Sequence, residues 1–251
     1  MRFSVLTSGS KANCTYVESG STRILIDCGL SARQTEVRLR ALGIDPASLD
    51  AIIVTHEHSD HINGVPVMSR RFELPVYANE GTSSFLRGVF ALEKFVTGKS
   101  FSIGELNIAP FSIVHDAHEP VGFSIEGQGI KFSQATDLGK VTPLVREALR
   151  GSHAVVLESN HDHDMLQNCD YPWELKQRIS SSHGHLSNES SSAFLAELLH
   201  GDLQHVVLGH LSENSNTPEL ALKAAQSQLS AHSLATLMCA CIANETPLLS
   251  L

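Results

Sequence analysis

The sequence predicts a single α/β domain built of layered strands and helices. Short apolar runs rich in β-branched residues alternate along the chain with segments of helical pattern. One of these runs leads directly into a cluster of polar side chains, an arrangement that layered α/β folds place at the carboxyl ends of their strands. The length of 251 residues and the hydrophobic fraction of 42% suit one large globular domain over residues 1–251.

The stretch AIIVTHEHSDHING, residues 51–64, is the one around which the chain is organised. Its apolar start, residues 51–54, predicts a buried strand, and a helical pattern follows over residues 62–71. Between the strand and the helix lie four side chains of the metal-ligand type: His56, His58, Asp60 and His61.

The spacing of these four side chains favours two metal ions. His56 and His58 are two residues apart, so in extended backbone both project to the same side and can bind one metal. Asp60 and His61 follow where the chain bends, so they can face a second metal. Two metals about 3.5–4 Å apart can hold both the attacking and the leaving oxygen of a displacement. A solvated polar loop is the alternative, and it would suit one exposed histidine better than four ligand-type side chains behind a buried strand.

The charge of the chain limits its partners. The net charge is −9 with histidines neutral, which argues against broad non-specific nucleic-acid binding. A nuclease is not excluded, because two bound divalent metals would add about +4 at the site itself. A stripe of arginines is one candidate guide for a polyanion: Arg33, Arg38, Arg40, Arg70 and Arg71.

The cysteines and the apolar runs predict a cytoplasmic protein without a membrane partner. Five cysteines show no disulfide framework, which favours a reducing compartment. Cys239 and Cys241 could form a metal pair, but alternation in an apolar strand explains their spacing better. Residues 1–10 lack the apolar core of a secretion signal, and the longest apolar run, residues 234–243, is too short to span a bilayer.

The first part of the chain predicts strands joined by turns, with helices between the later ones. The expected strands are residues 1–6, 14–18, 23–27, 51–54 and 74–77. The expected helices are residues 31–42 with Ser31 as the cap, residues 62–71 and residues 81–90. Between the first two strands, Ser8 and Asn13 are typical of a tight turn, and Asp27 closes an apolar run where an acid often caps a turn.

The second part repeats this alternation. The expected strands lie around Phe95 and at residues 101–103, 106–114, 121–126, 129–135, 153–157, 205–209 and 234–242. The expected helices are residues 141–150, 171–179, 189–200 and 218–229. A weak symmetry between the two halves of the chain suits a four-layer αββα sandwich.

Several polar residues stand where these later strands end. His115 directly follows one apolar run, with His118 as a competitor three residues on. Asp137 follows another, where a metal-bridging role and a helix cap are equally good explanations from the residues alone. His210 ends the strand at residues 205–209, and His161 opens the run HDHD, which we interpret as part of the rim of the site.

The motif H-x-H-x-D-H after an apolar strand resembles the metallo-β-lactamase superfamily. This resemblance implies the metallo-β-lactamase fold, a four-layer αββα sandwich, and it assigns the strand-end residues to a dinuclear metal site. His56, His58 and His115 would hold the first metal, with Asp60, His61 and His210 on the second and Asp137 bridging both.

The second half of the chain narrows the resemblance. The runs LESNHDHDML, YPWELKQRISSSHGHLSN and GHLSENSNTPEL are similar to the WalJ-like (YycJ-like) family of bacterial proteins, which are related to ribonuclease Z. The family implies a 5′→3′ DNA exonuclease whose nucleophile is a hydroxide between two metals. His185 would be the catalytic histidine, with Asp60 and Asp137 serving catalysis as ligands. Asp27 would orient a ligand histidine, and Ser8, Asn13 and His183 would either support the ligands from behind or line the rim of the site.

Other functions fit the same residues. They are a ribonuclease-Z-like hydrolase of RNA or small phosphodiesters, a thioester or lactone hydrolase, and a non-enzymatic regulator. The histidine-rich ligand set suits two zinc ions, while the carboxylate bridge also admits manganese or iron. The sequence leaves the native metal, the choice of DNA or RNA, the cleavage polarity and the oligomeric state open.

Overall fold

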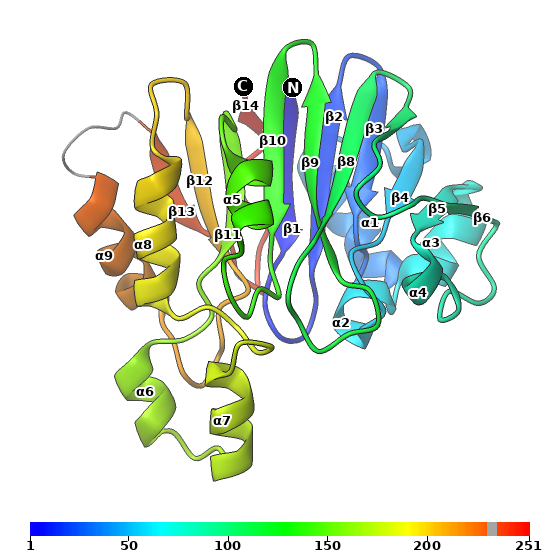
Figure 1. The fold of residues 1–251 in the computed structure, drawn as a ribbon. Helices are drawn as coiled ribbons and strands as arrows, with labels where there is room; N and C mark the ends of the chain where they lie inside the picture. The colour runs from blue at the N-terminus through cyan, green and yellow to red at the C-terminus, as the bar shows by residue number, and fades with distance from the viewer. Residues whose placement is uncertain (230–234) are drawn as a thin grey trace.

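The structure is a computed structural model that describes residues 1–229 and 235–251. Two seven-stranded sheets lie face to face in the described residues (Figure 1). In the first sheet the strands lie in the order β14 (Leu249–Ser250), β1 (Arg2–Thr7), β2 (Cys14–Ser19), β3 (Thr22–Ile26), β4 (Ala51–Ile53), β5 (Pro75–Ala78) and β6 (Ala91–Lys94). In the second sheet the order is β13 (Thr236–Cys239), β12 (His205–Gly209), β11 (Ala154–Glu158), β10 (Ile130–Ala135), β9 (Val121–Gly127), β8 (Leu106–Ser112) and β7 (Phe101–Ile103).

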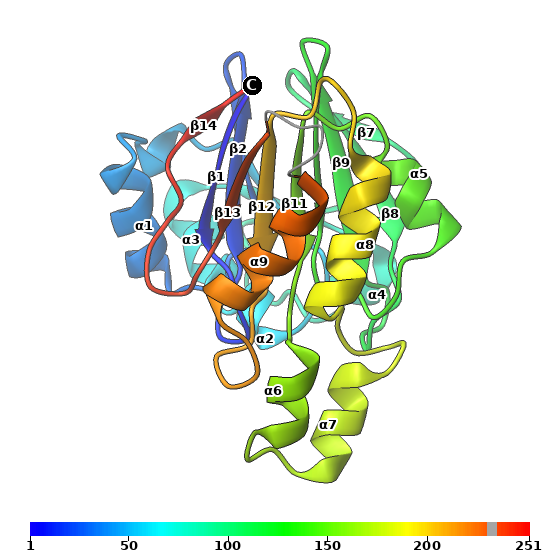
Figure 2. The same cartoon turned by 90° about the vertical axis from the view of Figure 1, so that its left-hand side faces the viewer.

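Helices cover the outer faces of the two sheets. Figure 2 shows α1 and α3 on one side of the strands and α5 and α8 on the other. Among the described residues the helices are α1 (Ala32–Ala41), η1 (Pro46–Ser48), α2 (Ser59–Ile62), α3 (Val65–Phe72), α4 (Glu80–Ser83), α5 (Pro143–Leu149), α6 (His163–Asn168), α7 (Trp173–Ser180), α8 (Asn188–Leu198) and α9 (Pro218–Leu229). The predicted αββα sandwich is confirmed. In the part of the chain that the structure describes, no helix combines the length and the apolar character that crossing a bilayer requires.

Alternation along the strands produces this layering, because successive side chains of a strand point to opposite faces. Ile24 and Ile26 of β3 enter the core between the sheets, whereas Leu25 packs in the cluster under the helices of the first sheet. In β11, Val156 faces the inter-sheet core, while Val155 packs in the cluster under the helices of the second sheet. Each sheet therefore buries both faces.

The strand directions bring the functional loops to one end of the sandwich. In the first sheet β3, β4, β5 and β6 run parallel, and in the second β10, β11, β12 and β13 do the same. The carboxyl ends of parallel strands share one edge of a sheet, which is where open α/β sheets bind ligands. The chain segments that follow β3, β4, β10, β11 and β12 all contribute side chains to a single cluster.

Some predicted elements differ from the structure. The predicted helix at residues 62–71 is divided into α2 and α3 around Gly64, because Pro66 begins a new helix at its first turn. The predicted helix at residues 81–90 is wrong beyond the short α4, and Gly88 has a φ of 69° that a continuing helix does not allow. Strand β6 ends just before Phe95.

The end of the chain also differs. The last predicted strand, residues 234–242, is the shorter β13, and its first residue, Leu234, lies outside the described residues. Strand β14, which pairs with β1, was not predicted.

A helical hairpin of α6 and α7 projects from the end of the sandwich that carries the cluster (Figures 1 and 2). Arg178 of α7 forms an ion pair with Asp116 at 2.9 Å, which ties the hairpin to the loop after β8. At the other side of the hairpin, the Asn214 side-chain amide donates to the Tyr171 hydroxyl at 2.9 Å. The hairpin is thus anchored to two loops beside the cluster.

Candidate metal centre

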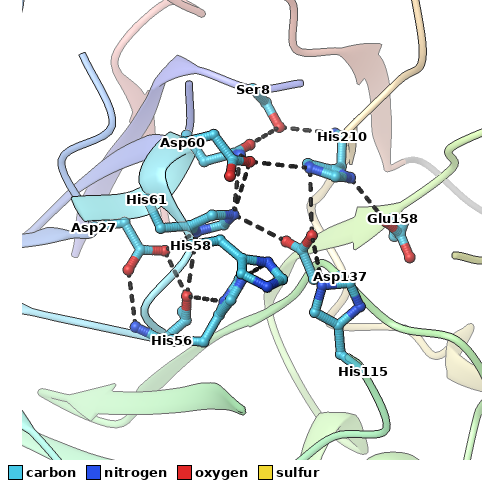
Figure 3. Close-up of polar contacts among 12 residues, drawn as sticks. Ser8, Asp27, His56, His58, Asp60, His61, His115, Asp137, Glu158 and His210 are labelled. Atoms are coloured by element: carbon cyan, nitrogen blue, oxygen red, sulfur yellow. Dashed lines mark hydrogen bonds and ion pairs between the residues drawn. The ribbon is translucent and has the colours of Figure 1, made fainter. Parts of the chain in front are cut away.

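The candidate site lies where the strand ends of both sheets meet (Figure 3). His56 and His58 follow β4, and the four-residue helix α2 carries Asp60 and His61. The remaining ligands that the resemblance assigns are supplied by loops at the ends of three strands of the second sheet or close behind them: His115 after β8, Asp137 after β10 and His210 after β12.

The structure brings all seven of these side chains together. Potential ligand atoms lie within 4.8 Å of one another in four overlapping groups. The groups are His56–His58–His115, Asp60–His61–His210, His56–His61–Asp137 and Asp137–Glu158–His185–His210. Asp137 and His56 occur in more than one group, so the cluster is continuous, with Asp137 shared between its two ends.

Hydrogen bonds fix which nitrogen each histidine offers. His61 donates from Nδ1 to Asp27 at 2.8 Å, and His210 donates from Nδ1 to Glu158 at 3.0 Å. His115 donates from Nδ1 to a backbone carbonyl oxygen at 3.3 Å. In all three rings Nε2 faces the carboxylate of Asp137, which is how proteins usually orient metal-binding histidines toward the metal.

Asp27 is the anchor behind the first-sheet ligands. Its two carboxylate oxygens accept from the Thr55 backbone N–H and the Thr55 hydroxyl, both at 2.8 Å. The same hydroxyl lies 3.0 Å from His56 Nδ1. One buried carboxylate thus holds His61 directly and His56 through Thr55.

Three residues of the site have left-handed backbone. Asp27 has a φ of 60°, and Asp137 and His210 each have a φ of 57°. Residues other than glycine rarely adopt this conformation, which is found at functional sites where the surrounding structure imposes it. At Asp137 and His210 the turn directs the side chain back across the strand ends and into the cluster (Figure 3).

Two buried atoms at the centre of the cluster indicate that a cation binds there. Asp137 Oδ2 and His210 Nε2 are buried and have no hydrogen-bond partner among the described residues. The rings of His56 and His61 pack with centroids 4.1 Å apart, and Asp137 Oδ2 lies 3.1 Å from His61 Nε2. Buried polar atoms without partners are costly unless they ligate a metal or meet another polar group. The residues present therefore fit divalent cations.

Burial and the close packing of charged groups also shift the pKa values of the histidines in the cluster. Burial, with the charge of neighbouring imidazoles, lowers the pKa of His56 and His115 and keeps both rings neutral. Burial opposes the charged form of His210 as well, but Asp137 and the other carboxylates raise its pKa to about 10. The carboxylates of the cluster require positive charge close by, which imidazolium rings or metal cations can supply.

Glu158 is a residue of the site that the sequence analysis missed. It ends β11, is fully buried, and accepts hydrogen bonds from His185 Nδ1 at 2.8 Å and His210 Nδ1 at 3.0 Å. Its other oxygen accepts two backbone N–H groups. Burial by itself would raise the pKa of Glu158, but the charges and hydrogen bonds of these two histidines lower it to about 2. Its position at the end of an apolar strand, like that of Asp137, is the signal in the sequence that indicates a role in the site.

His185 lies at the mouth of the cluster. Its side chain is 20% exposed, and its ring centroid lies 5.2 Å from that of His115 and 5.0 Å from that of His210. Because Nδ1 is bound to Glu158, Nε2 is the nitrogen left for another partner. His185 is thus held by a buried acid and partly open to solvent.

Ser8 and Asn13 lie behind the ligands. The Ser8 hydroxyl accepts the His210 backbone N–H at 2.8 Å, and the Asn13 side-chain amide donates to Asp60 at 3.1 Å. Both residues are buried and hydrogen-bond to each other at 3.2 Å. Both residues therefore contact the predicted ligands from behind, and Ser8 also lines a pocket formed with the segments after β12 and β13.

The other predicted rim histidines lie outside the four groups. His161 is buried, and its backbone forms a bridge with Ser187 next to the loop of His185. His183 is exposed and contacts the neighbouring hydroxyl of Ser182. The competitor of His115, His118, is exposed and forms an ion pair with Glu57.

The comparisons with known proteins agree with this geometry. A family profile described as "Beta-lactamase superfamily domain" matches residues 22–210. The chain belongs to the beta-lactamase superfamily. The match runs from β3 to His210 and so includes each of the seven assigned ligands.

Two relatives in the superfamily are similar over most of their length. Exodeoxyribonuclease YycJ of Bacillus anthracis is 37% identical over 227 residues, which cover 88% of the chain and 86% of the relative. Exodeoxyribonuclease WalJ of Streptococcus pneumoniae serotype 2 (strain D39) is 37% identical over 228 residues, which cover 88% of the chain and 85% of the relative. The predicted WalJ-like family is confirmed.

A solved structure shows the same fold at low identity. The metallo-beta-lactamase fold protein YhfI from Bacillus subtilis matches with a TM-score of 0.76 at 14% identity, covering 98% of both chains. The predicted metallo-β-lactamase fold is therefore confirmed independently of sequence similarity.

Proposed function

We propose that this beta-lactamase superfamily protein is a metal-dependent nuclease, and specifically a 5′→3′ DNA exonuclease. The observation that carries the proposal is the assembly of seven ligand-type side chains with the His185–Glu158 pair at one end of the sandwich. The exodeoxyribonuclease relatives, at 37% identity over 88% of the chain, support a nucleic-acid substrate.

The chain offers places for two divalent cations. His56, His58 and His115 would hold one, and Asp60, His61 and His210 the other, with Asp137 shared between them. Imidazole and carboxylate ligands suit zinc or manganese, and iron is compatible with the same set. Bound there, two such ions would polarise a phosphodiester and activate water at neutral pH.

The protein groups around the cations have separate tasks. Glu158 accepts from Nδ1 of both His185 and His210, which fixes the two rings and leaves Nε2 of His185 for another partner. From this position His185 can donate a hydrogen bond to the phosphate or a proton to the leaving oxygen. Asp27 and Ser8 keep the ligands in place from behind, which preserves the geometry between substrates.

Several arginines of the predicted stripe contact other groups of the protein. Arg38 donates to the backbone carbonyls of Leu6 and Ile242, and Arg71 forms an ion pair with Glu36. Arg70 donates to a backbone carbonyl as well. Arg33 and Arg40 are exposed members of the stripe, and bound cations would add further positive charge at the cluster itself.

The compartment is also part of the proposal. All five cysteines are free: Cys14, Cys28, Cys169, Cys239 and Cys241. Free thiols fit a reducing environment, and we place the protein in the cytoplasm on that basis.

The test is cleavage of end-labelled single- and double-stranded DNA and RNA, with Mn²⁺ or Zn²⁺ supplied. We expect stepwise shortening of DNA from the 5′ end by the wild type. His56→Ala should abolish it, because that variant removes a ligand shared by two of the groups. His163→Ala, which removes an exposed histidine outside the groups, is the matched control and should remain active.

Other outcomes select other functions. Shortening of RNA alone would make the protein a ribonuclease of the same fold. Bound metals without cleavage of any nucleic acid would overturn the proposal and direct the assay to thioesters and lactones. An inability to bind metals would leave a non-enzymatic regulator.

A further inference from the structure

A pocket of about 550 Å³ adjoins the cluster of candidate metal ligands on the side of His58. Its lining comes from the loop after β4, from the segment after α4 and from the loop after β8, and it includes His58, Glu57, Phe85 and His118. Because His58 belongs both to this pocket and to a ligand group, whatever fills the pocket lies next to a phosphate bound at the cluster.

Two rings form the wall of the pocket. Phe85 is 43% exposed, which is unusual for a phenylalanine, and its ring centroid lies 4.8 Å from that of His118 with the planes at 52°. The His118 ring is fixed because Glu57 accepts from its Nδ1 at 2.7 Å and from its backbone N–H at 2.8 Å. An exposed aromatic face beside a held imidazole is a surface on which a flat ring can stack.

Glu57, which lines the pocket, also carries an unused hydrogen-bond acceptor. The Glu57 side chain is only 7% exposed, and Oε1 is the oxygen that His118 occupies. The other oxygen, Oε2, is buried and has no hydrogen-bond partner among the described residues. A buried carboxylate oxygen without a partner is costly, and it would be satisfied by a ligand that presents an N–H group.

We propose that this pocket is a nucleobase subsite in which Phe85 and His118 stack on a base flanking the cleaved bond and Glu57 Oε2 accepts an N–H from its edge. The inference rests on the proposed nuclease function, to which it adds the part of the substrate that is recognised. A nucleobase suits the pocket better than a second phosphate, because the carboxylates of Glu57 and Asp116 repel anions. Carboxylate acceptors pair with amino groups of bases in other nucleic-acid complexes.

The first test varies the base next to the cleaved bond of single-stranded DNA. An adenine there is compared with an abasic tetrahydrofuran residue, on each side of the bond in turn. Base–aromatic stacking should make the wild type favour adenine by about tenfold or more in kcat/KM. Phe85→Ala should lose most of this preference through KM, and Phe85→Trp should keep it. Phe90→Ala, which removes an exposed phenylalanine outside the pocket, is the matched control and should behave as wild type.

The second test isolates the acceptor. Glu57→Gln keeps a carbonyl oxygen for His118 and replaces the free oxygen by an amide N–H. The wild type should favour adenine over unsubstituted purine, which lacks the amino group, by about fivefold. Glu57→Gln should lose this preference while still favouring either base over the abasic residue. Equal use of adenine and purine by the wild type would contradict the role of Glu57.

Binding separates the subsite from the nuclease function. The same strands with phosphorothioate linkages are titrated calorimetrically in the presence of metal. If the wild type cleaves and binds base-bearing and abasic strands equally, the subsite is overturned while the nuclease function stands. If no nucleic acid is cleaved, the nuclease function fails. A binding preference for the base that Phe85→Ala removes would then still support the subsite, and its absence would overturn it.

Discussion

One buried carboxylate, Glu158, couples the ligand His210 to the histidine at the mouth of the cluster. The same oxygen, Oε1, accepts from both rings, and its other oxygen is held by two backbone N–H groups. The carboxylate therefore cannot rotate without breaking several hydrogen bonds at once. A hydrogen bond of this kind sets the tautomer and the direction of each imidazole.

Substitutions of this pair should separate catalysis from metal binding. We expect His185→Ala to retain its metal and to lose turnover by about 100-fold or more, because it removes a proton donor and no ligand of the two metals. Glu158→Gln should lose about 10- to 100-fold in activity or metal affinity, since one amide N–H would face a donor. Metal content and turnover of both variants check this. Glu197→Gln, at an exposed ion pair, is the control and should behave as wild type. Full activity of His185→Ala would contradict the role of His185 as proton donor.

The sequence predicted which side chains come together where this follows from local spacing. His56, His58, Asp60 and His61 lie within six consecutive positions soon after a buried strand, so their convergence is a local property. His115, Asp137 and His210 came from the family resemblance, because their meeting depends on the order of strands in the second sheet. The support from Ser8 and the double contact of Glu158 depend on tertiary contacts between segments up to 202 residues apart, and no local pattern encodes them.

At the scale of elements, helix α7 positions the loop that carries His185. The His185 backbone N–H donates to the carbonyl of Ile179 at 2.9 Å, so the loop folds back onto the end of α7. A β-carbon on Gly184 would lie 2.2 Å from the backbone oxygens of Arg178 and Ile179. Only a residue without a side chain fits between the loop and the helix.

Gly184→Ala should therefore impair the site without touching a side chain in it. Forcing a methyl group against backbone should cost about 1–3 kcal/mol of stability. It should also lower turnover by about 100-fold, because a shift of about 1 Å in His185 is enough for that. Thermal unfolding and turnover measure the two effects. Gly201→Ala, whose new β-carbon would meet nothing within 4 Å, is the control and should leave stability and turnover unchanged. Wild-type stability and turnover in Gly184→Ala would contradict the close fit between the loop and the helix.

The two helices whose prediction was wrong are each interrupted near a glycine. The segment at residues 81–90 contains helix-compatible side chains, but Gly88 adopts a left-handed conformation and the chain instead makes turns that expose Phe85. The division between α2 and α3 arises at Gly64, where a β-carbon would lie 1.9 Å from the Leu30 carbonyl oxygen. Close backbone approaches between distant segments are not visible in periodicity.

At the scale of the whole molecule, the candidate site joins the two sheets. His56, Asp60 and His61 belong to loops of the first sheet, while His115, Asp137 and His210 belong to loops of the second. A cation bound by ligands of both sheets restrains them relative to each other. Metal binding should therefore stabilise the fold as well as enable catalysis.

Removal of the metal should lower the thermal midpoint. Free metal at about 100 times its dissociation constant adds about 2.7 kcal/mol, which is a shift of roughly 5–10 °C for a chain of this size. Calorimetry of the protein before and after chelation checks this. His56→Ala should show a smaller shift, and equal midpoints with and without metal would contradict a cation that joins the sheets.

The left-handed backbone at Asp27, Asp137 and His210 also bears on how such a protein can be improved. Each of these conformations costs about 1–2 kcal/mol for a side chain other than glycine. Glycine or asparagine would relieve this backbone cost, but each such change would remove a group that holds or supports a cation, and with it the stability that bound metal adds. At these three positions the backbone cost is offset only while the side chain keeps its partners in the site.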